Sequence, residues 1–255
     1  LFLYVKGILR LDLGFSFRQQ MPVATLILQR LPATLLLTGT AFAISLAFGI
    51  LFGALAARFA GTWADTAITV GALVFYATPL FWVALMYLFA LVLGWLPSFG
   101  YETVGANYTG LAHVLDVAAH LILPATTIGL FFMATYARMT RASMLEVNRL
   151  DLVKTARAKG LSDTVIQRRD VRRNALVPVV TLGGLQAGTL VGGAVLTETV
   201  FAWPGIGRLM YEALLQRDYN LLLGVFVVCS AMVLAFNLIT DLVYRSVDPR
   251  IEFAS

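Results

Sequence analysis

The chain has 255 residues, of which 59% are hydrophobic and only 13% are charged. Soluble domains carry about 25% charged residues, so this composition excludes an ordinary water-soluble protein and indicates a membrane protein. The formal net charge is +5, and in a membrane protein such an excess reports topology before it reports nucleic-acid binding. The single cysteine, Cys229, excludes a disulfide within the chain and a cysteine-based metal site.

Five apolar stretches approach or exceed the roughly 20 residues that the hydrocarbon core of a bilayer requires. The third is short when counted strictly, and we expect it to extend from Val117 towards Arg138. No soluble domain or internal repeat interrupts the pattern. The fold class is therefore an all-α integral membrane protein, a polytopic helical bundle. The predicted spans are residues 31–57, 67–93, 121–136, 175–199 and 219–244.

The distribution of basic residues predicts the orientation of these spans. Segment 138–174 holds ten of the nineteen basic residues, and basic loops favour the cytoplasm. Placing this segment inside also places 58–66 and the tail 245–255 inside. Segments 94–120 and 201–218 then lie outside.

By the same parity, residues 1–30 are expected to be external and to precede a membrane domain of residues 31–244. Segment 1–30 is nevertheless basic, with Lys6, Arg10, Arg18 and Arg30 against Asp12 alone. An external start should not be basic. We therefore expect a further spanning helix upstream of Leu1, and hence six spans in the full-length parent, whose N-terminus would be cytoplasmic.

Small residues recur at every fourth position in two spans. Four-residue spacing keeps them on one helix face, where a neighbouring backbone can approach closely. We interpret the stripes as tight helix packing; sliding contacts between two states of the bundle are the alternative. The stripes are Ala41, Ser45, Gly49, Gly53 and Ala57, and Gly184, Gly188 and Gly192.

Polar side chains within the spans are sparse and form no charged relay. Ionisable groups inside a membrane are functional candidates, although Asp241 and Glu198 lie near span ends, where we favour a structural role. Gln186 and Thr189 are flanked by glycines and are better candidates to line a wet pathway. The candidate pathway or gate residues are Gln186, Thr189, Glu198, Trp203, Pro204, Gly205, Asn237 and Asp241.

The motifs of nucleotide and metal chemistry are missing from the sequence. It has no Gly-rich loop ending in Gly-Lys-Ser/Thr, no His-Glu-x-x-His and no Gly-x-Ser-x-Gly. His113 and His120 are expected to be solvated residues of an external segment rather than a metal pair. We predict a non-catalytic chain that itself binds no cofactor and no metal. Nucleic acid is not an expected partner either, because aromatic residues for base stacking are missing between Arg138 and Asn174.

The basic segment 138–174 carries the most specific signal. Each Arg or Lys at mid-bilayer costs about 2.5–3.5 kcal/mol on insertion scales, so the segment must project into water. Its length suits two short helices broken at Gly160, where glycine tolerates a turn that a side chain would strain. Ser162 and Asp163 are suitable starters for the second helix.

The stretch from Asp151 to Pro178 resembles the cytoplasmic loop signature of bacterial ABC importer permeases. Thr155-Ala-Arg-Ala-Lys-Gly-Leu161 is similar to the peptide/nickel (dipeptide/oligopeptide) branch in particular, although many families carry Glu-Ala-Ala at its start. The resemblance extends from about Asp12 to the C-terminus. Further matches are Arg30-Leu-Pro-Ala-Thr-Leu35, Thr140-Arg-Ala-Ser-Met-Leu-Glu146, Glu198-Thr-Val-Phe-Ala-Trp-Pro-Gly-Ile-Gly-Arg208, Arg217-Asp-Tyr219 and Asp248-Pro-Arg250.

This resemblance implies a type I ABC importer transmembrane fold and a permease subunit of the bacterial plasma (inner) membrane. It implies four partner chains: two ABC ATPase subunits that bind the ATP and Mg, a second homologous permease subunit, and an extracytoplasmic substrate-binding protein. The loop with Trp203, Pro204 and Gly205 would form the gate that faces the binding protein. The docking residues for the ATPase would be Thr155, Ala156, Arg157, Ala158, Lys159, Gly160 and Leu161.

Other functions remain open at the level of the sequence. An ion-coupled or passive transporter acting without an ATPase would need ionisable groups in mid-span or a filter-like polar ring. A membrane scaffold whose loop recruits cytosolic proteins is a third reading, and a loop that merely anchors topology is a fourth. Members of the resembled branch carry dipeptides, longer peptides, glutathione, sugars or nickel chelates, and the sequence does not choose among them.

Overall fold

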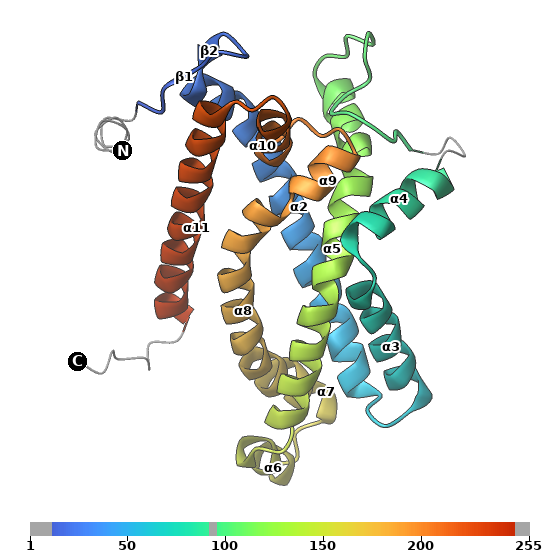
Figure 1. Ribbon diagram of the computed structural model, residues 1–255. Helices are drawn as coiled ribbons and strands as arrows, with labels where there is room; N and C mark the ends of the chain where they lie inside the picture. The colour runs from blue at the N-terminus through green and yellow to red at the C-terminus, as the bar shows by residue number, and fades with distance from the viewer. Residues whose placement is uncertain (1–11, 92–95, 248–255) are drawn as a thin grey trace, which may run out of the picture. The chain divides into compact units, whose positions relative to one another are not determined.

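A computed structural model describes residues 12–91 and 96–247 of the chain, apart from the side chains of 88–91, 168, 170, 187–189, 191–193, 241 and 243–247. The described part consists of helices, the loops that connect them and one short hairpin (Figure 1). The elements are β1 (Phe15–Ser16), β2 (Met21–Pro22), α2 (Val23–Arg58), α3 (Trp63–Ala77), α4 (Leu80–Leu91), α5 (Leu111–Val147), α6 (Asp151–Ala158), α7 (Asp163–Ile166), η1 (Gln167–Val171), α8 (Arg172–Gly193), α9 (Val195–Val200), α10 (Ile206–Leu215) and α11 (Tyr219–Val247).

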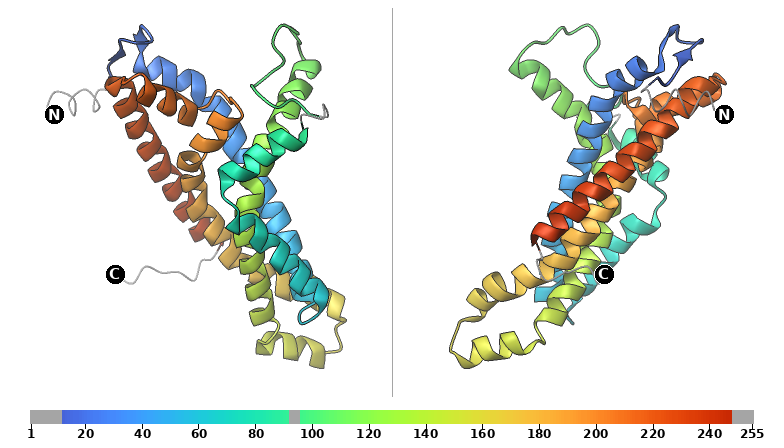
Figure 2. Two further views of the ribbon diagram at one scale, coloured as in Figure 1. Left: turned by 45° about the vertical axis from the view of Figure 1, so that its right-hand side comes forward. Right: turned by 90° about the vertical axis from the view of Figure 1, so that its left-hand side faces the viewer.

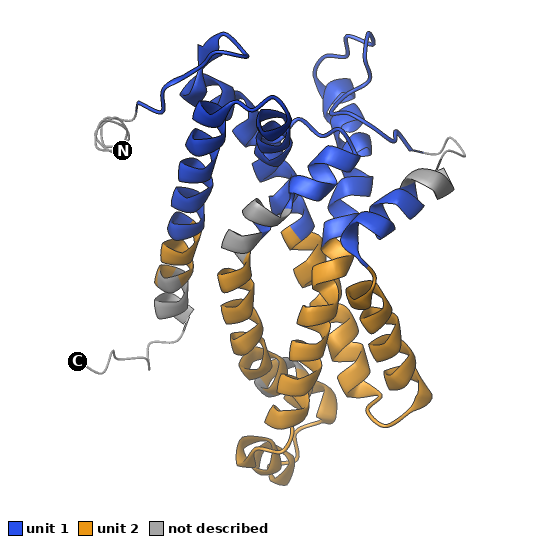
Figure 3. Ribbon diagram, in the orientation of Figure 1, with its two compact units in different colours: residues 1–41, 79–128, 188–235 blue, residues 42–78, 129–187, 236–255 orange. Residues whose placement is uncertain are grey.

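The chain divides into two compact units, which Figure 3 colours separately. Unit 1 comprises residues 1–41, 79–128 and 188–235, and unit 2 comprises 42–78, 129–187 and 236–255. The expectation of one membrane domain over residues 31–244 stays a prediction. Each unit is described separately below.

Three predicted spans are confirmed as long apolar helices, although their bounds differ. α2 and α5 run for 36 and 37 residues, and α11 is apolar enough to span over Tyr219–Thr240. The third span is longer than predicted, because α5 runs from Leu111 to Val147 and includes Pro124. Figure 2 shows this helix as one continuous ribbon. Thr126 and Thr127 sit just after that proline, and their hydroxyls donate to the carbonyls of Ile122 and Leu123.

The predicted second span is wrong as a single helix. It is interrupted at Thr78 and Pro79, so that α3 and α4 count at most as one broken span. Proline lacks the amide N–H and restricts the residue before it, and Thr78 is extended. The predicted fourth span falls on α8 and α9; many side chains there lie outside the described residues, so this span stays a prediction.

The N-terminal segment differs from the expectation as well. Residues 23–30 are the first two turns of α2, because a helix that begins at the membrane surface tolerates polar residues such as Gln29 and Arg30. Before α2, β1 pairs antiparallel with β2. The hydroxyl of Ser16 donates to the carboxylate of Asp218, which also caps α11 by accepting the amide of Leu221. Residues 1–11 and 248–255 lie outside the described part.

Unit 1 has two apolar cores. The first joins the start of α2 to α10 and the start of α11, around Val23, Leu209 and Leu221. The second joins α4, α5 and the end of α9 through Ala84, Leu123 and Phe201. Both cores hold segments that are distant in sequence, so they fix the loop between α9 and α10.

Unit 2 is built around the close approach of α2 and α5. A Cβ at Gly49 would overlap Tyr136, and one at Gly53 would overlap the Ala137 carbonyl and Thr140. Tight packing of the first small-residue stripe is therefore confirmed; such approach is how helices associate where lipid provides no hydrophobic drive. In the second stripe Gly184 packs against Thr240.

A further core in unit 2 supports the segment between α5 and α8. Buried apolar side chains from the ends of α2 and α5 and from the start of α8 pack around those of α6, α7 and η1. Its members are Ala57, Met144, Val147, Val153, Ala156, Ile166, Val171 and Ala175.

Candidate functional site

The helix break predicted at Gly160 is present, and its geometry is defined. α6 ends at Ala158, and Gly160 has a φ of 78°. The amide of Gly160 donates to the carbonyl of Arg157 (2.9 Å), and that of Leu161 donates to Ala156 (3.3 Å). This pair of bonds is the Schellman motif, in which the left-handed position favours glycine. Ser162 stands at the N-cap of α7 as predicted, but its side chain makes no capping bond.

α6 has one face buried within unit 2 and one face exposed. Val153 and Ala156 point into the core that supports the helix, whereas Leu152 is 39% exposed and Thr155 is exposed. Beyond the turn, Leu161 and Val165 are exposed too. Among the predicted docking residues, Ala156 therefore lies on the supporting side.

The charges of this segment are solvated. Arg157 lies 3.2 Å from Asp163, and both side chains are more than half exposed. Lys154 pairs with Asp151 in the same way, and Lys159 is exposed. Exposed ion pairs contribute about 0–1 kcal/mol to stability, so these side chains can exchange partners at little cost.

In unit 1 the loop that follows α9 begins with the same motif. The amide of Trp203 donates to the carbonyl of Glu198 (2.8 Å), and the amide of Ala202 donates to Thr199 (3.3 Å). Ala202 has a φ of 53°, a left-handed conformation that costs an L-residue roughly 1–2 kcal/mol. Arg208 compensates, because its Nη1 donates to the Ala202 carbonyl at 2.6 Å.

Glu198 organises this loop from inside. Its side chain is fully buried; Oε1 accepts the hydroxyl of Thr34 at 2.7 Å, and Oε2 accepts the amide of Arg208 at 3.0 Å. Thr34 in turn accepts the amide of Ile206 at 2.7 Å. A Cβ at Gly205 would overlap the Glu198 carboxylate. A buried carboxylate needs such donors to offset its desolvation, so Glu198 holds this loop in place; its assignment to the pathway or gate stays a prediction.

Trp203 is the anchor of the same loop. Its side chain is fully buried, and its indole N–H donates to the carbonyl of Ala33 at 2.8 Å. Tyr101 packs against it, with ring centroids 5.0 Å apart. The contacts with Ala33 of α2 and with Tyr101 therefore hold this loop in place.

The remaining pathway candidates lie on α8 and α11. Gln186 is half-buried on α8 in unit 2, and Asn237 is half-exposed on α11. The side chains of Thr189 and Asp241 lie outside the described residues. These four assignments stay predictions.

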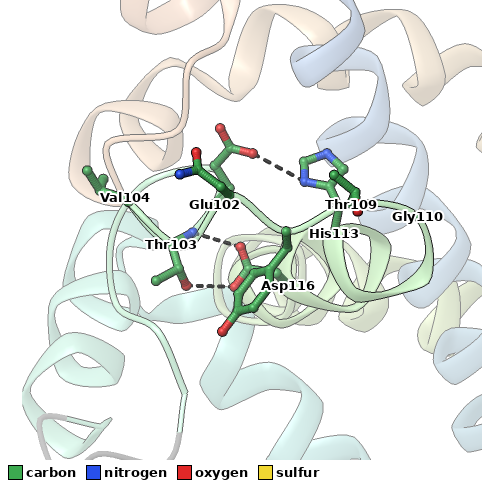
Figure 4. A pocket seen from close by; sticks show the side chains of 10 residues that line it. Glu102, Thr103, Val104, Thr109, Gly110, His113 and Asp116 are labelled. Atoms are coloured by element: carbon green, nitrogen blue, oxygen red, sulfur yellow. Dashed lines mark hydrogen bonds and ion pairs between the residues drawn. The ribbon is translucent and has the colours of Figure 1, made fainter.

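A cavity of about 590 Å³ lies between residues 102–110 and the start of α5 (Figure 4). Asp116 accepts both the amide and the hydroxyl of Thr103 at 2.7 Å, and Glu102 lies 3.3 Å from the ring of His113. His120 is buried and bonds to the Asp116 carbonyl. Both carboxylates are engaged by their own chain, so these contacts fix the segment onto α5. No His, Cys, Asp and Glu cluster suited to a metal occurs in the described part.

Sequence reasoning missed three residues that hold these regions. Thr34 and Arg141 lie inside segments that carry the family resemblance, which was the only available signal. Asp65, the partner of Arg141, had no such signal; it was only the single acidic residue in the predicted cytoplasmic segment 58–66.

Known proteins resemble this chain over most of its length. A family described as "Binding-protein-dependent transport system inner membrane component" matches residues 49–253. The chain is 41% identical to the dipeptide transport system permease protein DppB of Alkalihalophilus pseudofirmus, over 98% of this chain and 80% of the relative. It is 39% identical to the oligopeptide transport system permease protein AppB of Bacillus subtilis, over 95% and 76% respectively. DppB of Escherichia coli is 38% identical, over 98% and 79%.

Solved structures share the fold. A chain of the MetNI methionine ABC transporter in an inward facing conformation matches with a TM-score of 0.67 at 20% identity, over 88% of this chain and 97% of that chain. A chain of an amino acid ABC transporter crystallised with histidines matches with a TM-score of 0.65 at 18% identity, over 88% and 94%. At these identities the likeness concerns the fold alone, and it confirms the predicted fold class.

Proposed function

This chain belongs to the family of binding-protein-dependent transport system inner membrane components, and from that premise we propose that it forms one half of the peptide pathway in an ATP-driven importer. The family makes it a multi-pass protein of the inner membrane, in agreement with its long apolar helices. The peptide substrate rests on the relatives, which are dipeptide and oligopeptide permeases by name. The family also favours this function over an ion-coupled or passive transporter that acts alone.

The observation that carries the proposal is that α6 has one buried face and one exposed face. Val153 and Ala156 lock one face into the core of unit 2, while Leu152 and Thr155 are exposed on the other. Because its buried face is packed into that core, a displacement of α6 by a partner would be transmitted to the helices of unit 2. We assign the exposed face, together with Leu161 and Val165, to a groove of an ATPase subunit.

The charged rim of this surface suits a protein partner. Lys159 is exposed, and Arg157 makes only a solvated pair with Asp163. Charges of this kind orient an encounter and raise its rate more than they raise affinity. Hydrolysis belongs to the ATPase chains in this proposal, so this chain is a non-catalytic subunit.

For substrate entry, we assign residues 202–208 to the gate that faces a substrate-binding protein. Glu198, Trp203 and Arg208 pre-form this loop, so opening must move it as one piece. A second, homologous permease would complete the pathway, with two ATPase subunits below.

Site-directed cross-linking tests the docking assignment. In a Cys229→Ser background, Thr155→Cys should form a short bismaleimide cross-link to a cysteine placed in the groove of an ATPase subunit in the assembled transporter. Val153→Cys is the matched control, because it lies on the same helix but is fully buried, and it should not react. The adducts are identified by mass spectrometry of the purified complex.

The same transporter in proteoliposomes, with its binding protein, should import a labelled dipeptide only when ATP is present. Failure of Thr155→Cys to cross-link to the ATPase, in a complex that retains its ATPases, would contradict docking through α6. Import that continues without ATP would contradict the ATP-driven function itself.

A further inference from the structure

Unit 2 contains one shielded ion pair that the docking surface does not use. Arg141 of α5 donates from Nε to Oδ1 and from Nη2 to Oδ2 of Asp65, both at 2.7 Å. Asp65 is only 5% exposed. Two parallel charge-assisted bonds of this kind are stronger and more directional than a single contact.

The Asp65 carboxylate also accepts hydrogen bonds from the turn before α3 and from α3 itself. Its Oδ2 accepts the amide of Gly61 at 3.0 Å, and the hydroxyl of Thr69 lies 3.4 Å from Oδ1. Gly61 has a φ of 81°, which glycine alone adopts readily. One carboxylate therefore joins the α2–α3 turn, α3 itself and α5.

The arginine lies next to the support of α6. Met144 follows Arg141 by about one helical turn and belongs to the core that buries Val153 and Ala156. On the other side, Gly53 of α2 packs against Thr140. The ion pair thus connects α3 to the stretch of α5 on which α6 rests.

Other contacts bind α3 to α5 along the rest of its length. Ala72 packs on Met133 and Ala134, and Tyr76 stacks on Phe131 with centroids 5.5 Å apart. These contacts are apolar and can slide. Arg138 of α5 also stacks on the Tyr76 ring of α3, but the forked pair joins these helices by two charge-assisted hydrogen bonds, so it is suited to fix the register of α3 against α5.

We propose that Asp65 and Arg141 are positioning residues of the transport cycle: their pair makes α3 move with α5 when the ATPase displaces α6. This inference rests on the proposed function. A role in folding alone would stabilise unit 2 without affecting how hydrolysis is converted into import.

The test uses the assembled transporter in proteoliposomes and measures dipeptide imported per ATP hydrolysed. Asp65→Asn keeps the shape of the side chain but removes its charge, and should lower this ratio roughly fivefold. Arg141→Lys keeps the charge but not the fork, and should lower it less. The double variant Asp65→Asn/Arg141→Gln should match Asp65→Asn, because contacting residues act as a unit. The amount of assembled complex and its basal ATPase rate should remain near those of the parent.

Arg138→Gln is the matched control. Arg138 lies one turn away on the same helix, but its guanidinium stacks 4.8 Å from the Tyr76 ring centroid. Its loss should leave the ratio unchanged. A normal ratio in both Asp65→Asn and Arg141→Lys would overturn the proposal, as would a loss of assembled complex with a normal ratio in what remains. Failure of the proposed function looks different, since the parent itself would then not couple import to hydrolysis.

Discussion

The turns after α6 and α9 share one hydrogen-bonding motif but achieve it by different means. At the end of α6 the left-handed position is Gly160, and a Cβ there would meet no atom within 4 Å. At the end of α9 it is Ala202, whose carbonyl is held by Arg208 and whose neighbour Trp203 is fully buried. The first turn follows from the residue's own freedom, and the second is imposed by its surroundings.

This difference shows how each region can move. A turn that depends on one glycine keeps its shape when the surroundings change, which suits a helix that must meet a separate chain. A turn that depends on Glu198, Arg208 and Trp203 keeps its shape only while those contacts last. The loop after α9 is therefore expected to change conformation cooperatively, and α6 to move as a rigid body.

Removing the buried carboxylate tests the imposed turn most severely. Glu198→Ala leaves the Thr34 hydroxyl and the Arg208 amide without their acceptor and opens a cavity, so the free energy of unfolding should fall by about 3 kcal/mol. Unfolding of the purified chain in an SDS titration measures this loss. Glu212→Ala is the control, because Glu212 is half-buried and makes an i,i+4 ion pair with Arg208; its loss should cost under about 1 kcal/mol. Equal effects of the two substitutions would show that the loop does not depend on Glu198.

A substitution at Gly160 tests the autonomous turn. Gly160→Ala introduces no clash but forces an L-residue to a φ of 78°, so local opening of α6 should become easier by about 1 kcal/mol. Amide hydrogen exchange of Ala156 and Leu161 should then accelerate about fivefold. Gly160→Asn should have a smaller effect, since asparagine tolerates the left-handed region better than alanine does. Unchanged exchange in Gly160→Ala would show that the α6 turn, too, is imposed from outside.

The reverse substitution gives the smallest effect. Ala202→Gly relieves left-handed strain but gains chain entropy in the unfolded state, so stability should change by no more than about 0.5 kcal/mol. Ala202→Val should destabilise, because a β-branched residue fits this conformation poorly. The same SDS titration distinguishes them. A gain above about 1 kcal/mol in Ala202→Gly would mean that Arg208 does not compensate the strain.

The features that depend on local chain chemistry were predictable from the sequence. The break at Gly160 and the close packing at Gly53 follow from glycines at defined spacings, and both are confirmed. The interruption at Pro79, by contrast, divides a stretch that was predicted as one span. Helix lengths were less accurate, because polar residues such as Arg30 continue a helix into the membrane surface.

Contacts between distant residues were not predictable. Thr34 lies 164 positions from Glu198 and Asp65 lies 76 positions from Arg141, and no local pattern pairs them. The left-handed Ala202 carries no sequence signal either, since alanine is the ordinary residue of helices. The family resemblance marked the segments that contain Thr34, Glu198 and Arg141 without indicating what each residue touches.

The indole of Trp203 gives the loop after α9 an intrinsic optical label. Trp63 and Trp82 are at least half exposed, and Trp203 is enclosed with its N–H engaged. Emission from this ring should be blue relative to theirs, and it should shift red whenever the indole loses its carbonyl partner to solvent. Fluorescence of the unlabelled chain can thus follow the opening of this loop in real time.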